Sequence, residues 1–184
     1  MRAFVAIDVP DINVIDAMVA FQGELEATRA DLKLVARESL HFTVKFLGEV
    51  TDAQAKEADA RMRELKLPAE DVAVRGVGAF PSLGRPGVVW VGVASDDEAK
   101  VSGIAGPIAR VLNGIGEEDR RPFQAHITVA RVRPGPSRQN LEALIRANID
   151  RPFGGVRLSE FKLKSSTLTP KGPIYSDVGV YRLG

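Results

Sequence analysis

The chain has 184 residues, 45% of them hydrophobic and 27% charged, and a formal net charge of +1. This composition excludes a disordered chain, and the length predicts one domain over residues 1–184 with a substantial core. Because the net charge is close to zero, a strong overall attraction to nucleic acid is excluded, and a site for a polyanion must be local. The sequence has no cysteine, which excludes disulfides, a thiolate metal site and a cysteine nucleophile, and no run of roughly 20 apolar residues, so we expect a soluble protein of the cytoplasm without a membrane span.

In the first half of the chain, apolar spacing predicts strands and helices in alternation. They are, in chain order, a strand over Ala3–Asp8, a helix over Ile12–Leu25, a strand over His41–Leu47, a helix over Ala55–Leu65 and a strand over Val72–Phe80. Thr51 or Asp52 is suited to cap the second of these helices.

The second half shows a similar order. The predicted elements are a strand over Val88–Ala94, a helix over Val101–Leu112, a strand over His126–Val132, a helix over Leu141–Ile145, and strands over Val156–Leu163 and Ile174–Tyr181. Pro107 weakens or kinks the first of these helices, and Ser137 is suited to cap the second.

The two halves match when the sequence is shifted by 85 positions, the separation of its two histidines. The shift places H-F-T-V at His41–Val44 on H-I-T-V at His126–Val129 and aligns the flanking strands and helices. Chance alignment of apolar runs is the alternative, and the matching motifs argue against it. The pattern predicts an α+β fold in which a β-α-β-α-β unit is used twice, as two similar lobes facing each other across a groove.

Side chains two apart on a strand share a face, so His41 and Thr43 are predicted to point into this groove, with Lys45 beyond them. Phe42, Val44 and Phe46 are then predicted to pack in the core. In the second motif, His126 and Thr128 share the open face, while Ile127 and Val129 point inward. Phe80 and Trp90 are also expected to belong to the core.

Two imidazoles with two hydroxyls suit proton transfer at a phosphate. Near neutral pH one imidazole can accept a proton while the other donates one, and in-line displacement at phosphorus needs such groups on opposite sides. Threonine hydroxyls can donate hydrogen bonds to the non-bridging oxygens. Two histidines without nearby carboxylates make a poor metal site, so we expect neither a metal nor another cofactor.

Basic residues gather around both motifs. They are Lys33, Arg37 and Lys45 near the first, and Arg120, Arg121, Arg131, Arg133 and Arg138 near the second. They favour a phosphate-bearing ligand, and a solvated, charge-protected strand edge remains the alternative for about half of them. By strict alternation Arg131 lies on the face opposite His126, so it reaches the groove only through a bulge or from the end of the strand.

Five segments resemble motifs of one known family. They are R-A-F-V-A-I-D at Arg2–Asp8, L-H-F-T-V-K-F-L-G at Leu40–Gly48, F-P-S-L-G-R-P-G-V-V-W-V-G-V at Phe80–Val93, P-F-Q-A-H-I-T-V-A-R at Pro122–Arg131 and S-x-L-x-P-x-G-P-x-Y at Ser166–Tyr175. In this order, over nearly the whole chain, they resemble the two-histidine (2H) phosphoesterases, and within them the RNA 2′,3′-cyclic phosphodiesterases, also called 2′-5′ RNA ligases.

The resemblance implies a bilobal fold with a pseudo-twofold axis and antiparallel sheets lining a water-filled groove. It implies metal-independent hydrolysis of a 2′,3′-cyclic phosphate on RNA to a 2′-phosphate, with tRNA fragments among the candidate substrates. His41 takes the family's role of proton donor to the leaving 3′ oxygen, and His126 that of proton acceptor from water. Thr43, Thr128 and Arg131 correspond to phosphate ligands.

Other functions remain open at this point. The same site running backwards would join RNA ends through a 2′-5′ link, and a smaller cyclic nucleotide or a cyclised ADP-ribose derivative is a further candidate substrate. A non-catalytic module that binds RNA ends is the rival from another class. The joint presence of both histidines and both threonines favours catalysis, and a monomer is expected because no helix has an obvious exposed apolar face.

Overall fold

The computed structural model describes residues 1–184 and contains four α-helices and nine strands. The helices are α1 (Ile12–Ala27), α2 (Asp52–Arg63), α3 (Glu98–Val111) and α4 (Arg138–Ala147). The strands are β1 (Arg2–Asp8), β2 (Leu32–Leu34), β3 (His41–Glu49), β4 (Glu70–Ser82), β5 (Arg85–Val93), β6 (Ile127–Val132), β7 (Pro152–Leu158), β8 (Glu160–Thr169) and β9 (Gly172–Arg182). None of the helices combines the length and the apolar character that crossing a membrane requires.

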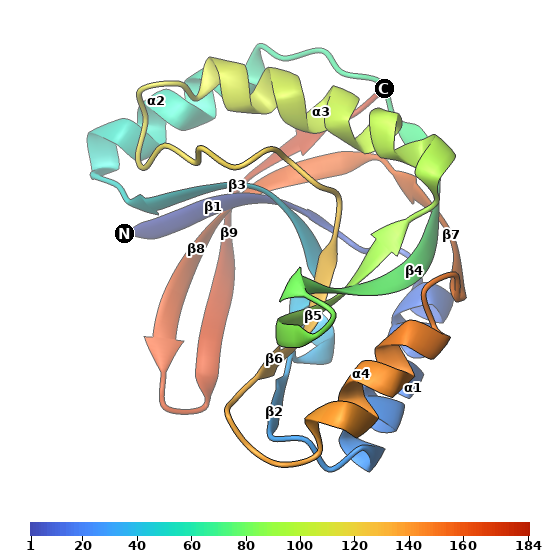
Figure 1. Ribbon diagram of the computed structural model, residues 1–184. Coiled ribbons are helices and arrows are strands. Elements are labelled where there is room, and N and C mark those ends of the chain that lie inside the picture. Colours follow the sequence, from blue (N-terminus) through green and yellow to red (C-terminus); the bar gives the residue numbers. More distant parts are fainter.

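The nine strands form one antiparallel sheet that consists of two blocks. Along the sheet the order is β7-β4-β5-β6-β3-β1-β8-β9, and β2 pairs with β6. The β6 block (β7-β4-β5-β6) and the β3 block (β3-β1-β8-β9) are joined by a single residue pair, Phe42 with Ile127. Helices α1 and α4 contact the β6 block, α2 contacts the β3 block, and α3 contacts β3 and also β4. The pair α1 and α4 and the pair α2 and α3 lie at different ends of the molecule (Figure 1).

The predicted duplication is present, but the two blocks are not the two halves of the chain. Shifting β1-α1-β3-α2 by 85 positions brings these elements onto β5-α3-β6-α4. However, β4 leaves the first half to pair with β5, and β8 leaves the second half to pair with β1. Helix α1 likewise packs on β7, and α3 packs on β3. Each block is therefore completed by segments of the other half.

The strand predicted over Val156–Leu163 is wrong as a single element. The chain leaves β7 at Leu158 and starts β8 at Glu160. β7 pairs with β4 at one end of the sheet, whereas β8 pairs with β1 and β9 in the other block. The alternation of apolar residues shifts by one position at this break, because Val156 and Leu158 stand at even positions whereas Phe161 and Leu163 stand at odd ones. This shift was the sign of the break in the sequence.

Both blocks share one core. A single cluster of 41 buried residues includes Met18 and Phe21 of α1 as well as Ile104 and Ile108 of α3. All four are fully buried, and the helical spacing of the sequence predicts this for Met18, Ile104 and Ile108. The helices therefore fix the two blocks relative to each other through apolar contacts on both sides of the junction.

Helix caps follow the sequence in one of the two predicted places. Thr51 caps α2, with its hydroxyl accepting from the Gln54 amide while the Gln54 side chain accepts from the Thr51 amide. The predicted cap at Ser137 is wrong. Ser137 precedes α4 with φ of 66°, in the left-handed region, and its side chain makes no cap hydrogen bond. A serine in that conformation does not direct its hydroxyl to the first-turn amides.

A buried glutamine ties α1 to the strand of the second histidine motif. Only 5% of Gln22 is exposed, and its Nε2 donates hydrogen bonds to the carbonyl oxygens of Val35 (2.8 Å) and Val129 (2.9 Å). Val129 is the last residue of the H-I-T-V motif. Because a buried amide needs its partners, this contact specifies where α1 lies on the sheet.

We expect Gln22→Leu to lower the free energy of unfolding by about 2 kcal/mol, because it removes two buried hydrogen bonds while nearly conserving volume. Urea unfolding followed by circular dichroism measures the change. Gln139→Leu, on the exposed side of α4, is the matched control and should stay within about 0.5 kcal/mol of the unsubstituted protein. Equal effects of the two substitutions would contradict the assignment.

Candidate active site

His41 and His126 lie on the same face of the sheet, next to the junction between the blocks. They immediately precede Phe42 and Ile127, the joining pair, and both members of that pair are fully buried. Because side chains alternate along a strand, the residues on either side of the pair point to the opposite, open face. This face, which we call the histidine face, carries His41, Thr43, His126 and Thr128.

Both imidazoles are oriented in the same way. Nδ1 of His41 donates to the carbonyl of Ser39 at 2.7 Å, and Nδ1 of His126 donates to the carbonyl of Gln124 at 2.7 Å. A carbonyl only accepts, so Nδ1 carries a hydrogen in each ring and Nε2 is the nitrogen left for chemistry. Nε2 of His41 lies 2.9 Å from the Thr43 hydroxyl.

A β-bulge at Val44 changes which residues of β3 reach the histidine face. Val5 and Ala6 are consecutive in β1, yet they pair with Lys45 and Thr43, so Val44 has no partner. Beyond the bulge the alternation of β3 is reversed.

The prediction that Lys45 accompanies His41 is therefore wrong, and so is the prediction that Phe46 belongs to the core. Lys45 lies on the helix side of the sheet, where it lines a hollow of about 630 Å³ together with Arg110 and Asn113. Phe46 pairs with Phe4 and turns to the histidine face.

A second bulge, at Val129, brings Arg131 to the histidine face. Trp90 pairs with Thr128, and Val88, which shares a face of β5 with Trp90, pairs with Arg131. Without a bulge, residues 128 and 131 would point to opposite faces; with Val129 unpaired, they point to the same one. Arg131 is exposed there. The sequence required a bulge, or a position at the strand end, for Arg131 to reach the groove, and the bulge is present.

Two aromatic rings lie beside His41. The ring centroids of Phe4 and Tyr175 are 5.2 and 5.6 Å from that of His41, and Tyr175 meets the imidazole edge-on. Tyr175 comes from β9, the last strand of the β3 block. Sequence reasoning did not select either residue, although Tyr175 closes the last of the five family-like segments.

Two other aromatic rings lie beside His126. The centroids of Phe80 and Trp90 are 5.0 and 6.2 Å from that of His126. The expectation that both rings belong to the core is wrong, since both are half-buried on the histidine face. The indole of Trp90 lies flat over Gly78, where a Cβ would come within 2.2 Å of its ring.

Charged side chains that the sequence analysis did not select lie next to His41. Asp8 pairs with His41 across β1 and β3. Lys164, only 7% exposed, lies 3.0 Å from both Asp8 and Asp177, and Lys162 also contacts both carboxylates. The local sequence gave no sign of this cluster, because the burial of Lys164 depends on the pairing of β8 with β1.

The surroundings of His41 lower the pKa of its imidazole. Burial is the largest cause, because it disfavours the charged imidazole. The hydrogen bond to Ser39 and the negative charge of Asp8 raise the pKa, while the positive charges of Lys164 and of His126 lower it. The net effect favours a neutral His41 in the absence of a ligand.

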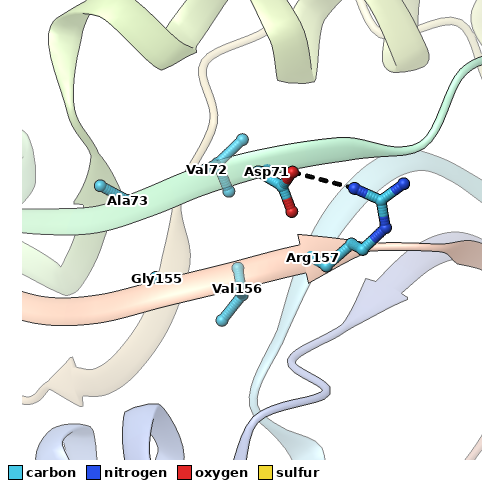
Figure 2. Close-up of a pocket in the computed structure, with 6 residues that line it drawn as sticks. All are labelled: Asp71, Val72, Ala73, Gly155, Val156 and Arg157. Atoms are coloured by element: carbon cyan, nitrogen blue, oxygen red, sulfur yellow. Dashed lines mark hydrogen bonds and ion pairs between the residues drawn. The ribbon is translucent and has the colours of Figure 1, made fainter.

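Nowhere in the molecule do three histidine, aspartate or glutamate side chains gather closely enough to hold a metal ion. A hollow of about 370 Å³ lies over β4 and β7, where Ala73 and Gly155 face each other beside the ion pair of Asp71 with Arg157 at 2.9 Å (Figure 2). It contains none of the predicted site residues.

Comparison with known proteins gives one family. The chain matches the family described as LigT-like phosphoesterase over residues 9–90 and 93–175. These two ranges are related by a shift of 84 or 85 positions, which agrees with the repeat seen in the sequence and in the strand order.

Relatives with curated names cover the whole chain. An RNA 2′,3′-cyclic phosphodiesterase of Archaeoglobus fulgidus is 37% identical, covering 98% of this chain and 99% of the relative. One of Methanothermobacter thermautotrophicus is 34% identical, covering 100% and 99%. Among solved structures, a protein of Thermus thermophilus has a TM-score of 0.77 at 29% identity, covering 99% of this chain and 97% of the other. E. coli LigT complexed with 3′-AMP has a TM-score of 0.78 at 22% identity, with the same coverage, and shares the fold.

Substitutions next to His41 should move its pKa in opposite directions. Asp8→Asn removes a negative charge and should lower the pKa further, whereas Lys164→Met removes a positive charge and should raise it. Because the chain has only two histidines, NMR titration of the imidazole C–H signals resolves each one. Lys56→Met, an exposed lysine of α2, is the control and should leave His41 unchanged. Shifts of the same sign in the first two variants would contradict this account.

Proposed function

The chain belongs to the LigT-like phosphoesterase family, and we propose that it hydrolyses 2′,3′-cyclic phosphates at RNA ends to 2′-phosphates without a metal, with His41 and His126 as its acid–base pair. The names of its relatives support the reaction. The observation that carries the assignment is the matched pair of imidazoles, each with Nδ1 fixed by a carbonyl and Nε2 left for proton transfer.

In this proposal the phosphate lies between the two imidazoles. Nε2 of His126 accepts a proton from water as the water oxygen forms its bond to phosphorus. The bond from phosphorus to the 3′ oxygen breaks, and Nε2–H of His41 donates its proton to that oxygen. The products are a 2′-phosphate and a 3′-hydroxyl, and the pair returns to its starting state by exchanging protons with solvent.

Thr43, Thr128 and Arg131 act as phosphate ligands in the proposal. Their positions on the histidine face put two hydroxyl donors and a guanidinium on the side where charge develops on the non-bridging oxygens. The hydroxyl of Thr43, which lies 2.9 Å from Nε2 of His41, turns to the phosphate when substrate arrives. This frees Nε2 for the leaving oxygen.

The lowered pKa of His41 fits a donor that is charged only when substrate is present. A bound phosphate anion favours the protonated imidazole and therefore raises its pKa again. His41 would then bind its proton together with the substrate and lose it to the leaving oxygen.

Further parts of the proposal concern the whole molecule. We propose that residues 1–184 act as one domain of two lobes and as a monomer in the cytoplasm, on RNA ends such as those of tRNA fragments. Both histidines come from one chain, so one copy holds a complete site, which supports the monomer.

We expect the purified protein, with EDTA present, to convert a short RNA ending in a 2′,3′-cyclic phosphate to the 2′-phosphate, resolved from the 3′-phosphate by chromatography. His41→Ala and His126→Ala should each slow turnover by about a thousandfold while the unfolding transition stays in place. Near-unchanged rates in either variant would contradict the acid–base assignment. If the protein binds this RNA but does not convert it, the result would favour a non-catalytic module that binds RNA ends.

The two roles can be separated with an RNA end that carries sulfur in place of the bridging 3′ oxygen. A leaving thiolate needs no protonation, so His41→Ala should recover most of its rate on this substrate, because only the donor has become dispensable. His126→Ala should remain slow. Recovery of His126→Ala instead of His41→Ala would reverse the roles.

A further inference from the structure

The hairpin of β8 and β9 extends beyond the sheet, and its tip approaches β2 of the other block. Tyr175, in the hairpin, has its ring centroid 5.6 Å from that of His41. At the tip, a Cβ on Gly172 would lie 3.9 Å from Nζ of Lys33 in β2, which pairs with β6 of the other block. Figure 1 shows the hairpin projecting from the sheet at the lower left, away from the four helices.

Positive charge without acidic partners gathers where the tip approaches β2. Lys33 pairs directly with Arg131, and Lys171 precedes Gly172 at the tip. Lys33, Arg131 and Lys171 are exposed, and none has a carboxylate within 4.0 Å.

Neighbouring cations differ in this respect. Arg37 binds Asp16 at 2.5 Å, and Arg133 lies 3.7 Å from Asp31. Such pairs belong to an ordinary charged surface and leave little charge for a ligand. Of the eight basic residues around the motifs, Arg37, Arg121 and Arg133 have acidic partners. Lys33 and Arg131 have none, and together with Lys171 they form the unpaired cations where the tip approaches β2.

Apolar surface leads from His41 to these cations. Ser166 pairs with Tyr175, and Leu168, which shares a face of β8 with Ser166, pairs with Pro173. Tyr175, Leu168 and Pro173 therefore lie in a row along one face of the hairpin. Leu168 is 69% exposed, so this row presents apolar side chains to solvent. Bases of single-stranded RNA pack on such side chains while the backbone follows positive charge.

We propose that the β8–β9 hairpin and β2 hold the RNA strand upstream of the terminal cyclic phosphate, with Lys33 and Lys171 binding its backbone phosphates. This inference rests on the proposed function and names its substrate class: an oligoribonucleotide end rather than a cyclic mononucleotide. A mononucleotide has no upstream phosphate, so it gains nothing from either lysine.

The test compares kcat/KM for a short RNA ending in a 2′,3′-cyclic phosphate with kcat/KM for the matching 2′,3′-cyclic mononucleotide. The ratio of the two should exceed one, and Lys33→Gln and Lys171→Gln should each lower it, roughly fivefold per lysine, because a contact to an upstream phosphate is lost. Lys66→Gln, an exposed lysine in the segment after α2, is the matched control and should leave the ratio unchanged. An unchanged ratio in both hairpin-side variants would overturn the proposal.

A binding measurement keeps this result separate from the proposed function. The affinity of a fluorescent RNA ending in a 2′-phosphate is measured over a range of salt concentrations, which requires no turnover. Each lysine substitution should weaken binding and reduce the slope of log affinity against log salt by about 0.7. Lysine variants that bind as the unsubstituted protein does would overturn the inference. Absence of turnover on either substrate by the unsubstituted protein would instead overturn the proposed function.

Discussion

A single residue pair, Phe42 with Ile127, joins the strands that carry the two histidines. Since His41 and His126 each precede one member of this pair, the geometry of one backbone contact sets where the imidazoles stand relative to each other. A single residue pair does not by itself hold two blocks of a sheet in a fixed arrangement. The exchange of β4 and β8 between the halves and the shared core hold the blocks together, so the joint is fixed by the whole fold rather than by local hydrogen bonds.

Duplication explains why the two imidazoles have the same orientation. Sequence differences after each bulge explain why their charged surroundings differ. Val44 and Val129 occupy equivalent positions, and both are bulged. The residue two positions later is Phe46 in one motif and Arg131 in the other, so equivalent positions carry an aromatic ring and a guanidinium. Asp8 pairs with His41 and has its own lysine partners. A symmetric scaffold thereby gives the two imidazoles unequal electrostatic surroundings, which an acid–base pair requires.

Hydrophobic periodicity predicted the helices and most strands. It also predicted which side chains of the two motifs point to the histidine face, from each histidine to the threonine two positions later. It failed for Lys45 and Phe46, because nothing in V-K-F distinguishes a bulged strand from a regular one. It placed Phe80 and Trp90 in the core because a half-buried aromatic wall and a core strand have the same apolar pattern. The position of Lys164 depends on pairing between β1 and β8, which are distant in sequence, so no local pattern reveals it.

Two strands outside the repeat, β2 and β9, lie beside the strands and residues of the histidine face, β2 against β6 and β9 with Tyr175 against His41. A shift of 85 positions takes β2 to residues 117–119, which form no strand, and β9 follows the last element of the second unit. The repeated elements supply a matched pair of imidazoles and hydroxyls, which in the proposed function act at one phosphate. Such a twofold arrangement cannot by itself distinguish the upstream strand from the free end. The unrepeated β2 and the β8–β9 hairpin, with Lys33 and Lys171, break that symmetry on one side, which is where direction along an RNA strand would be recognised.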